Sequence, residues 1–361
     1  MQPERLPSRI ILVRHGRSTF NDQGRYQGSS DKAILTLKGI ETARQVGDYL
    51  KHTPIDDVYI SPLVRVKQTA EEIFKTMGHK PPSVTVSGSL REIDLSVWEG
   101  LSYEHVRRQY PDAYTCWRQY PDKFKLPTAQ GTYHFPVNDL YQRAQAFWTR
   151  LPQIPGKTVL IVGHGGTNHA LISTALGLSA KDHHSLQQSN CGISVLEFLD
   201  HEVQLTQLNQ TTAIQETLPK LKAGKQGLQL LLLAEDSLTP GICDQLAQRL
   251  AEVKLDFCLS GITGQQWLPS LLQQHPRLVQ FVNEQEDFLQ DWKRAWTGSL
   301  YATDVLKTGV AIAPTTHIQT LLIESLGGHP DSATQIVLKP GHLSVIHYPK
   351  NHRPIVQAIN I

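Results

Sequence analysis

The sequence predicts an α/β protein in which helices cover both faces of a mostly parallel sheet, repeated in two tandem domains. Apolar runs at 10–13, 58–60 and 158–162 are each followed by a polar turn and a stretch with helical periodicity. Alternating strands and helices are typical of parallel sheets, because a crossover helix returns the chain to the same edge. The length of 361 residues also exceeds what one core usually holds. We therefore expect a three-layer α/β/α fold in residues 1–218 and again in residues 219–361.

The composition argues against several classes of protein. Lys and Arg number 35 against 33 Asp and Glu, so the net charge of +2 predicts no basic surface for nucleic acid. No apolar run reaches the length of a membrane span or a signal core, which predicts a cytoplasmic protein without a membrane partner. The four cysteines lie far apart, with no CxxC pair and no histidine at ligand spacing. We expect buried thiols, no disulfide, no metal and no cofactor.

The first strand leads directly into a candidate site. Residues 10–13 are apolar and run into Arg14, His15 and Gly16, at the carboxyl end of a predicted strand. Open α/β folds bind ligands at this edge, and a glycine lets the backbone approach a ligand closely. Residues 21–28 then form a polar loop rich in hydrogen-bond donors. Taken alone, each segment could equally be a strand end or a surface loop without function.

The next segments place an arginine at a helix start. Thr36 is the expected N-cap of a helix that runs through about Leu50. The strand at 58–60 ends before a proline, and residues 66–77 show helical periodicity. Arg65 should therefore lie beside the unpaired N–H groups of a helix start, which favour an anion. The alternative for Arg65 is a solvated surface side chain.

Two further segments carry ionisable side chains. Residues 90–101 place acids among apolar residues, which is costly for buried carboxyls without a role, and Glu92 is the candidate acid. Residues 102–137 are aromatic and basic, which fits either a lid over an anionic ligand or a packed helical insertion. The strand at 158–162 ends at His164, which opens a helix through about residue 176.

Four short segments, in this order, resemble a known family. They are Arg14-His15-Gly16, Ser61-Pro62-Leu63-Val64-Arg65, Leu90-Arg91-Glu92 and Gly163-His164-Gly165. The set resembles the histidine phosphatase superfamily, in its phosphoglycerate-mutase-like branch, over about residues 9–209. The resemblance implies that His15 is the nucleophile and Glu92 the proton donor. It also implies a phosphate and substrate pocket formed by Arg14, Arg65, His164, Asn21, Gln27, Gly28 and Gly165.

The chemistry of these side chains supports the roles that the resemblance implies. Two arginines and a second histidine disfavour a protonated imidazole, so His15 would be neutral and able to attack phosphorus. Guanidinium groups suit the three equatorial oxygens of a phosphoryl transition state, and no metal is then required. A glutamate can protonate the leaving alkoxide and later take a proton from the attacking water.

The segment that follows Glu92 separates two reactions within this family. The mutases carry a Glu-Arg-His-Tyr-Gly type segment, whereas this chain has Glu92-Ile93-Asp94-Leu95-Ser96 and resembles the phosphatase branch. The expected reaction is hydrolysis of a small phosphorylated metabolite, phosphoserine first. Its carboxylate would meet a cationic group formed by Arg107, Arg108, Arg118 and His134. The alternatives are a carboxylated sugar phosphate such as carboxyarabinitol 1-phosphate, a broad range of sugar phosphates, a phosphoglycerate mutase and a non-catalytic phosphate sensor. A homodimer is possible.

The second half of the chain reads as a repeat of the first. Residues 230–236 align with 10–16, and 255–260 align with 56–61. Trp296 and His317 follow Trp148 and His169 at a common offset, while Ser344, Val345 and Asn360 match Ser194, Val195 and Asn209. In this register the site residues become Ala234 for Arg14, Glu235 for His15, about Gly264 for Arg65 and Ile312 for His164. We therefore expect a degenerate, catalytically inactive second domain, joined through Gln215 to Gly227.

Overall fold

The chain divides into two compact units. The computed structural model describes residues 6–78, 81, 83–151, 154–200, 202–275, 278–283, 304–350 and 352–361. One unit comprises residues 1–205 and 209–216, and the other comprises 206–208 and 217–361. Trp296 lies outside the described residues. Among the helices that are described, none is long and apolar enough to cross a membrane.

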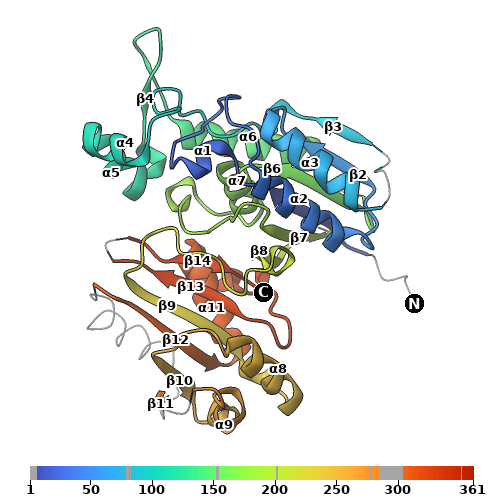
Figure 1. Cartoon of the computed structure of the whole chain (residues 1–361), viewed down its shortest axis with the longest axis vertical. Coiled ribbons are helices and arrows are strands. Elements are labelled where there is room, and N and C mark those ends of the chain that lie inside the picture. The colour runs from blue at the N-terminus through green and yellow to red at the C-terminus, as the bar shows by residue number, and fades with distance from the viewer. Residues whose placement is uncertain are drawn as a thin grey trace. The chain divides into compact units, whose positions relative to one another are not determined.

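The first unit is built on a six-stranded sheet (Figure 1). Its strands, in spatial order, are β3 (Val84–Val86), β2 (Asp57–Ile60), β6 (Thr158–Gly163), β1 (Ser8–Arg14), β7 (Ile193–Leu199) and β8 (Glu202–Gln210). The first four are parallel, and β7 is antiparallel to β1. The mostly parallel sheet expected from the apolar runs is therefore confirmed. The strand order reverses between β6 and β1, which makes this the topological switch point of the sheet. Ligands of open α/β sheets bind at the carboxyl ends of the strands at this point.

The four longer helices of this unit bury apolar residues, whereas the short helix α1 (Thr19–Asp22) has no buried residue. The longer helices are α2 (Leu37–Leu50), α3 (Val64–Thr76), α6 (Pro136–Arg150) and α7 (Gly165–Ala175). The buried residues of α2 and α3 share one core with those of the strands. The Thr36 hydroxyl accepts from the Gly39 N–H, so this residue is the N-cap of α2 as expected. Helix α3 begins at Val64, two residues earlier than expected, which puts Arg65 in its first turn.

The aromatic segment 102–137 is packed onto this unit. It forms α4 (Tyr103–Gln109), α5 (Pro111–Gln119) and a hairpin of β4 (Leu126–Pro127) and β5 (Tyr133–His134), as Figure 1 shows. Trp98 is fully buried, and its ring contacts those of Tyr26, Trp117 and Phe124. Aromatic clusters of this kind bury large areas. The segment is thus helical and partly packed, and its other expected role, as a lid over an anionic ligand, stays a prediction.

The second unit contains a sheet with the same strand order. In space it runs β11 (Val279–Asn283), β10 (Phe257–Gly261), β12 (Leu306–Ala313), β9 (Gly227–Ala234), β13 (Ser344–Tyr348) and β14 (Ile355–Ala358). When the strands of each unit are numbered along the chain, the two sheets have the same spatial order of strands. Its helices are α8 (Pro240–Leu250), α9 (Leu268–Leu271) and α11 (Thr315–Leu326). Short 3-10 turns in the chain include η1 (Gly88–Leu90), η2 (Pro121–Lys123), η3 (Ala180–Asp182), η4 (Thr212–Ile214), η5 (Glu235–Ser237), η6 (Thr263–Trp267) and η8 (Pro330–Gln335).

Within each unit, the same contact occurs at the amino ends of two neighbouring strands. The Asp56 carboxylate accepts the Thr158 N–H at 2.8 Å, and the Asp256 carboxylate accepts the Thr308 N–H at 2.8 Å. In return, each aspartate N–H donates to the carbonyl of the same threonine. Asp56 and Asp256 are therefore equivalent, one residue away from the register predicted by sequence.

The strand ladders also correct the expected equivalent of His164. Arg14 pairs with Gly163, and Ala234 pairs with Ala313. The residue that follows Ala313 is Pro314, which caps α11 as His164 caps α7. Pro314, and not Ile312, therefore stands where His164 stands in the first unit.

Candidate active site

His15 follows the last residue of β1, at the switch point of the first sheet. It is 1% exposed, and its backbone N–H donates to the Gly163 carbonyl on β6 at 3.0 Å. Ring atom Nδ1 lies 2.7 Å from the Gly16 carbonyl oxygen. A carbonyl can only accept, so Nδ1 carries the proton, and the lone pair of the neutral ring lies on Nε2. The backbone thus fixes the tautomer that a nucleophilic imidazole needs.

Gly16 allows α2 to approach this turn. A Cβ at Gly16 would lie 2.5 Å from the Gly39 carbonyl oxygen, so a larger residue would displace the start of the helix. The Gly16 N–H donates to the Thr69 hydroxyl of α3 at 2.9 Å. The turn is therefore held by both helices on this face of the sheet.

His164 lies beside His15, because β6 pairs with β1. The two ring centroids are 5.3 Å apart at an angle of 66°. His164 is fully buried, and its Nε2 lies 2.7 Å from the Ser61 hydroxyl at the end of β2. Its Nδ1 has no hydrogen-bond partner within the described part of the chain. Burial lowers the pKa of His164 well below its usual value, and the charges of Arg65 and Arg14 lower it further.

Two arginines are anchored by backbone carbonyls. Arg65 donates to the carbonyls of Gly28 at 2.9 Å and Ser30 at 2.7 Å, and Arg14 donates to the Gln188 carbonyl at 2.7 Å. The Nε–H of each is buried and, among the described residues, lacks an acceptor. Burial lowers the pKa of Arg65 to about 10, so the group stays charged at neutral pH. Each guanidinium is thus fixed in place and retains a donor for an anion.

Glu92 is held at the start of α7. Its carboxylate accepts the N–H groups of Gly166 at 3.1 Å and Thr167 at 3.0 Å, and the Thr167 hydroxyl also donates to it. A Cβ on Gly166 would lie 2.7 Å from Glu92 Oε1, so a glycine is needed for the approach.

Arg143 of α6 fixes the segment that carries Glu92. Its guanidinium donates to the carbonyls of Arg91 at 2.9 Å and Glu92 at 3.2 Å. Burial lowers the pKa of Arg143, and the Glu92 charge opposes this effect. No sequence pattern indicated Arg143, because its partners are backbone atoms about 50 residues earlier in the chain.

The predicted loop residues gather around the His15 turn. Asn21 accepts at its side-chain oxygen from Asn190 Nδ2 at 3.1 Å, and the Ser18 hydroxyl donates to Gln27 Oε1 at 2.7 Å. Gly28 has a φ of +51°, and its carbonyl binds Arg65. Asn190 also donates to the His15 carbonyl at 3.0 Å. Asn190 carried no sequence signal, since it precedes β7 in a loop without periodicity.

The last two predicted residues lie in different surroundings. Gly165 is the first residue of α7, and a Cβ there would come within 3.3 Å of Arg14 Nε. This glycine therefore lies against the buried guanidinium. His134 lies on the β4–β5 hairpin, where its Nδ1 is 3.5 Å from the Asp139 carboxylate at the start of α6. Its described contacts do not join it to the residues around His15.

The resulting site combines two imidazoles, two buried guanidinium groups and one carboxylate. Nothing in the described residues groups three or more His, Cys, Asp or Glu side chains in a way that could hold a metal ion. His15 and His164 are in ring contact, and the charges of Arg14 and Arg65 act on His164, so these side chains lie close together. The arrangement can therefore bind and attack a phosphate ester using side chains alone.

Comparison with known proteins agrees with this chemistry. The model of the histidine phosphatase superfamily (branch 1) matches residues 10–211. The 2-carboxy-D-arabinitol-1-phosphatase of Triticum aestivum is 36% identical over 233 residues, covering 63% of this chain and 46% of that protein. Phosphoserine phosphatase 1 of Hydrogenobacter thermophilus is 28% identical over 209 residues, covering 58% of this chain and 95% of that protein. The chain thus spans less than half the length of the plant relatives it matches.

A solved structure gives the same result for the fold. The phosphoserine phosphatase of Entamoeba histolytica, crystallised with 3-phosphoglyceric acid, is 27% identical with a TM-score of 0.50. The alignment covers 57% of this chain and 99% of that one. The family model matches residues 10–211, which correspond to the first unit and contain all four sequence segments.

Proposed function

Because this chain belongs to branch 1 of the histidine phosphatase superfamily, we propose that it hydrolyses small phosphomonoesters through a phosphohistidine at His15. The observation that carries the proposal is the fixed tautomer of His15, which directs its lone pair to Nε2 beside His164. The attack is supported by Arg14 and Arg65, whose Nε–H groups have no acceptor among the described residues and can donate to phosphoryl oxygens.

The reaction proceeds in two displacements. In the first, His15 Nε2 forms a bond to phosphorus, the ester P–O bond breaks, and Glu92 gives a proton to the leaving oxygen. In the second, water attacks the phosphohistidine, the N–P bond breaks, and Glu92 takes the water's proton as inorganic phosphate leaves. Arg14, Arg65 and His164 hold the phosphoryl oxygens in both steps.

The substrate class proposed is a small phosphate ester that also carries a carboxylate. Phosphoserine and 2-carboxyarabinitol 1-phosphate, the substrates in the names of two relatives, share this feature. Phosphoserine is the first candidate from the sequence, and the higher identity to the plant enzyme favours the carboxylated sugar phosphate as the second. Arg107 and Arg108 are exposed on α4 and Arg118 is half-buried on α5, and these supply the positive charge for a carboxylate.

Two measurements test the reaction. Alkaline quenching after mixing with substrate should trap a phosphate on His15 by mass spectrometry, and inorganic phosphate should then accumulate. A mutase would instead move phosphate between two substrate positions without releasing it, and a sensor would bind without forming the adduct. A panel of phosphomonoesters should show a higher kcat/KM for carboxylated esters than for glycerol phosphate and simple sugar phosphates, and the opposite ranking would contradict the substrate class.

We also infer that residues 219–361, which make up most of the second unit, are a degenerate copy without catalytic activity. The shared strand order and the two equivalent aspartate contacts support a common origin. Glu235 takes the place of His15, and its carboxylate accepts from the Thr263 hydroxyl at 2.8 Å. A carboxylate at this position repels phosphate. If the isolated unit released phosphate from any ester, this assignment would be wrong.

A further inference from the structure

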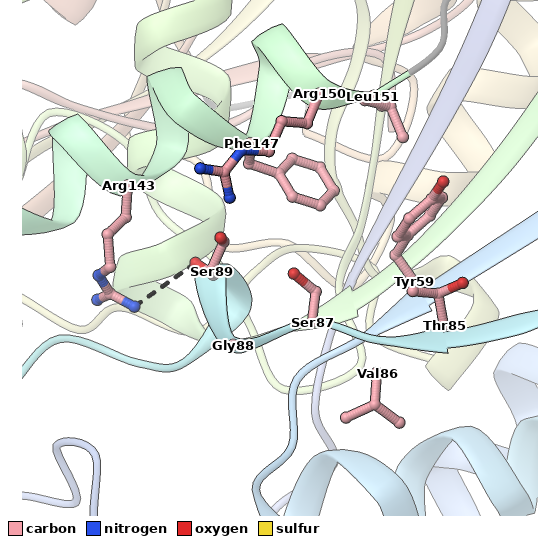
Figure 2. A pocket seen from close by; sticks show the side chains of 10 residues that line it. All are labelled: Tyr59, Thr85, Val86, Ser87, Gly88, Ser89, Arg143, Phe147, Arg150 and Leu151. Carbon is pink, nitrogen blue, oxygen red and sulfur yellow. Dashed lines mark hydrogen bonds between the residues drawn. The ribbon is translucent and has the colours of Figure 1, made fainter.

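A second cavity lies in the first unit, outside the residues around His15. It has a volume of about 550 Å³, which is the size of a small-molecule site. Its walls come from the ends of β2 and β3, from η1 and from the second half of α6. Figure 2 shows two guanidinium groups from α6, those of Arg143 and Arg150, near Ser89, and the Tyr59 and Phe147 rings beside them.

The polar lining of this cavity is cationic, and part of it has no partner among the described residues. Arg143 and Arg150 are its only charged residues, and no carboxylate lines it. Over the described part of the chain, the Arg150 guanidinium and the hydroxyls of Ser87 and Ser89 have no hydrogen-bond or ion-pair partner. A cluster of donors without an acceptor, inside a cavity, is the arrangement that binds an anion.

The apolar lining indicates the rest of the ligand. Tyr59 and Phe147 meet edge to face, with ring centroids 5.7 Å apart at 89°, and Phe147 is buried. Rings in such a wall pack against planar or apolar groups. A bare inorganic anion would leave this wall without contact. The cavity therefore suits a small organic anion with an aromatic body.

Arg143 connects this cavity to Glu92. The same guanidinium that lines the cavity donates to the carbonyls of Arg91 and Glu92, and it lies 3.5 Å from the Ser89 carbonyl. An anion in the cavity competes with these carbonyls for the donors of Arg143. Its binding would therefore release the segment that positions Glu92.

We propose that this cavity is an effector site for a small aromatic carboxylate or phosphate, and that its occupation lowers kcat at His15. The binding site is independent of the proposed hydrolysis, and only the effect on kcat rests on it. Arg150 is the residue to change, because its side chain is exposed and, among the described contacts, donates no hydrogen bond to a backbone carbonyl. Arg143 is unsuitable as the test, since its loss would move Glu92 directly.

The first measurement is binding to the full chain by calorimetry. Phenylphosphonate serves as the probe because its C–P bond is not hydrolysed. The wild type should bind two molecules per chain, and orthovanadate, which occupies a phosphoryl site, should displace one of them. Arg150→Gln should weaken the vanadate-insensitive site by about tenfold or more, as expected for the loss of one charged donor. Lys51→Gln removes one exposed positive charge at the end of α2 and should retain both sites.

The second measurement is turnover at saturating substrate. Phenylphosphonate should lower kcat of the wild type, and Arg150→Gln should remove this effect while leaving competitive inhibition at His15. Methylphosphonate, which has no ring, should compete at His15 without lowering kcat. One bound molecule per chain, or a second site unchanged by Arg150→Gln, would overturn the effector site. Two sites without an effect on kcat would overturn the link through Arg143, and two sites on a chain without hydrolysis would overturn only the proposed function.

Discussion

Replacing Gly166 by alanine should separate the role of Glu92 from that of the phosphate cradle. The Cβ of the new residue would lie 2.7 Å from Glu92 Oε1, about 0.7 Å closer than ordinary contact. The next nearest atoms to this Cβ are the Glu92 Cδ at 3.4 Å and a Leu140 methyl at 3.5 Å, so the carboxylate is the group in closest contact. No atom of Arg14 or Arg65 is among the three nearest to this Cβ.

The expected loss follows from the size of that displacement. A catalytic group misplaced by about 1 Å can cost about 10²-fold in rate, so kcat on an alkyl phosphate such as phosphoserine should fall by about 10- to 100-fold. Hydrolysis of p-nitrophenyl phosphate should fall less, because its leaving group needs little protonation. Stability should not fall, since alanine is favoured over glycine in a helix by about 1 kcal/mol.

The assay is phosphate release from both esters, with the denaturation midpoint measured in parallel. Gly241→Ala is the matched control, because Gly241 is also in the first turn of a helix and no atom lies within 4 Å of the position that an added Cβ would take there. This control should retain both activities. Unchanged turnover of the alkyl phosphate in Gly166→Ala, or equal losses on the two esters, would refute the role of Glu92 as the acid.

Three further predictions concern the nucleophile, the second unit and a buried histidine. His15→Ala should abolish hydrolysis while EDTA should not slow the wild type, and a rate lost with EDTA and restored by magnesium would contradict the metal-independent mechanism. Glu235→Ala should leave kcat within about twofold of wild type, since the second unit is proposed to be inactive, and a loss beyond tenfold would argue against this. Burial lowers the pKa of His183 to about 4, so the unfolded chain takes up a proton first as the pH falls below about 6.5. The resulting stability should be lost between about pH 6.5 and 4, by up to about 3 kcal/mol, and His183→Gln should show a weaker pH dependence in denaturation curves.

The sequence predicted the sheet and the main site residues for one physical reason. Strands of a parallel sheet are buried on both faces, so they read as continuous apolar runs with a sharp end. His15 and His164 each follow such a run, and parallel neighbours bring their carboxyl ends together. Their proximity could therefore be inferred before any contact was known.

The residues that were missed act through backbone atoms. Arg143 and Asn190 donate to backbone carbonyls of distant segments. Every residue has such a carbonyl, so the sequence does not indicate which ones act as acceptors. The position of Pro314 was missed for a different reason. A shift of two residues along an apolar strand keeps every side chain on its original face, so the pattern alone could not separate Ile312 from Pro314. Strand pairing was needed to fix the register.

The aspartate contact shared by the two sheets has a consequence for protein engineering. Asp56 and Asp256 brace the amino ends of the strands, whereas the residues that differ, His15 and Glu235, stand at the opposite ends. The contacts that stabilise the sheet and the side chains at the site position thus lie at opposite ends of the strands. The site side chains can therefore be exchanged without changing these contacts. Under the proposal that the second unit is inactive, side chains transplanted onto its sheet could be tested beside the proposed site of the first unit in the same polypeptide.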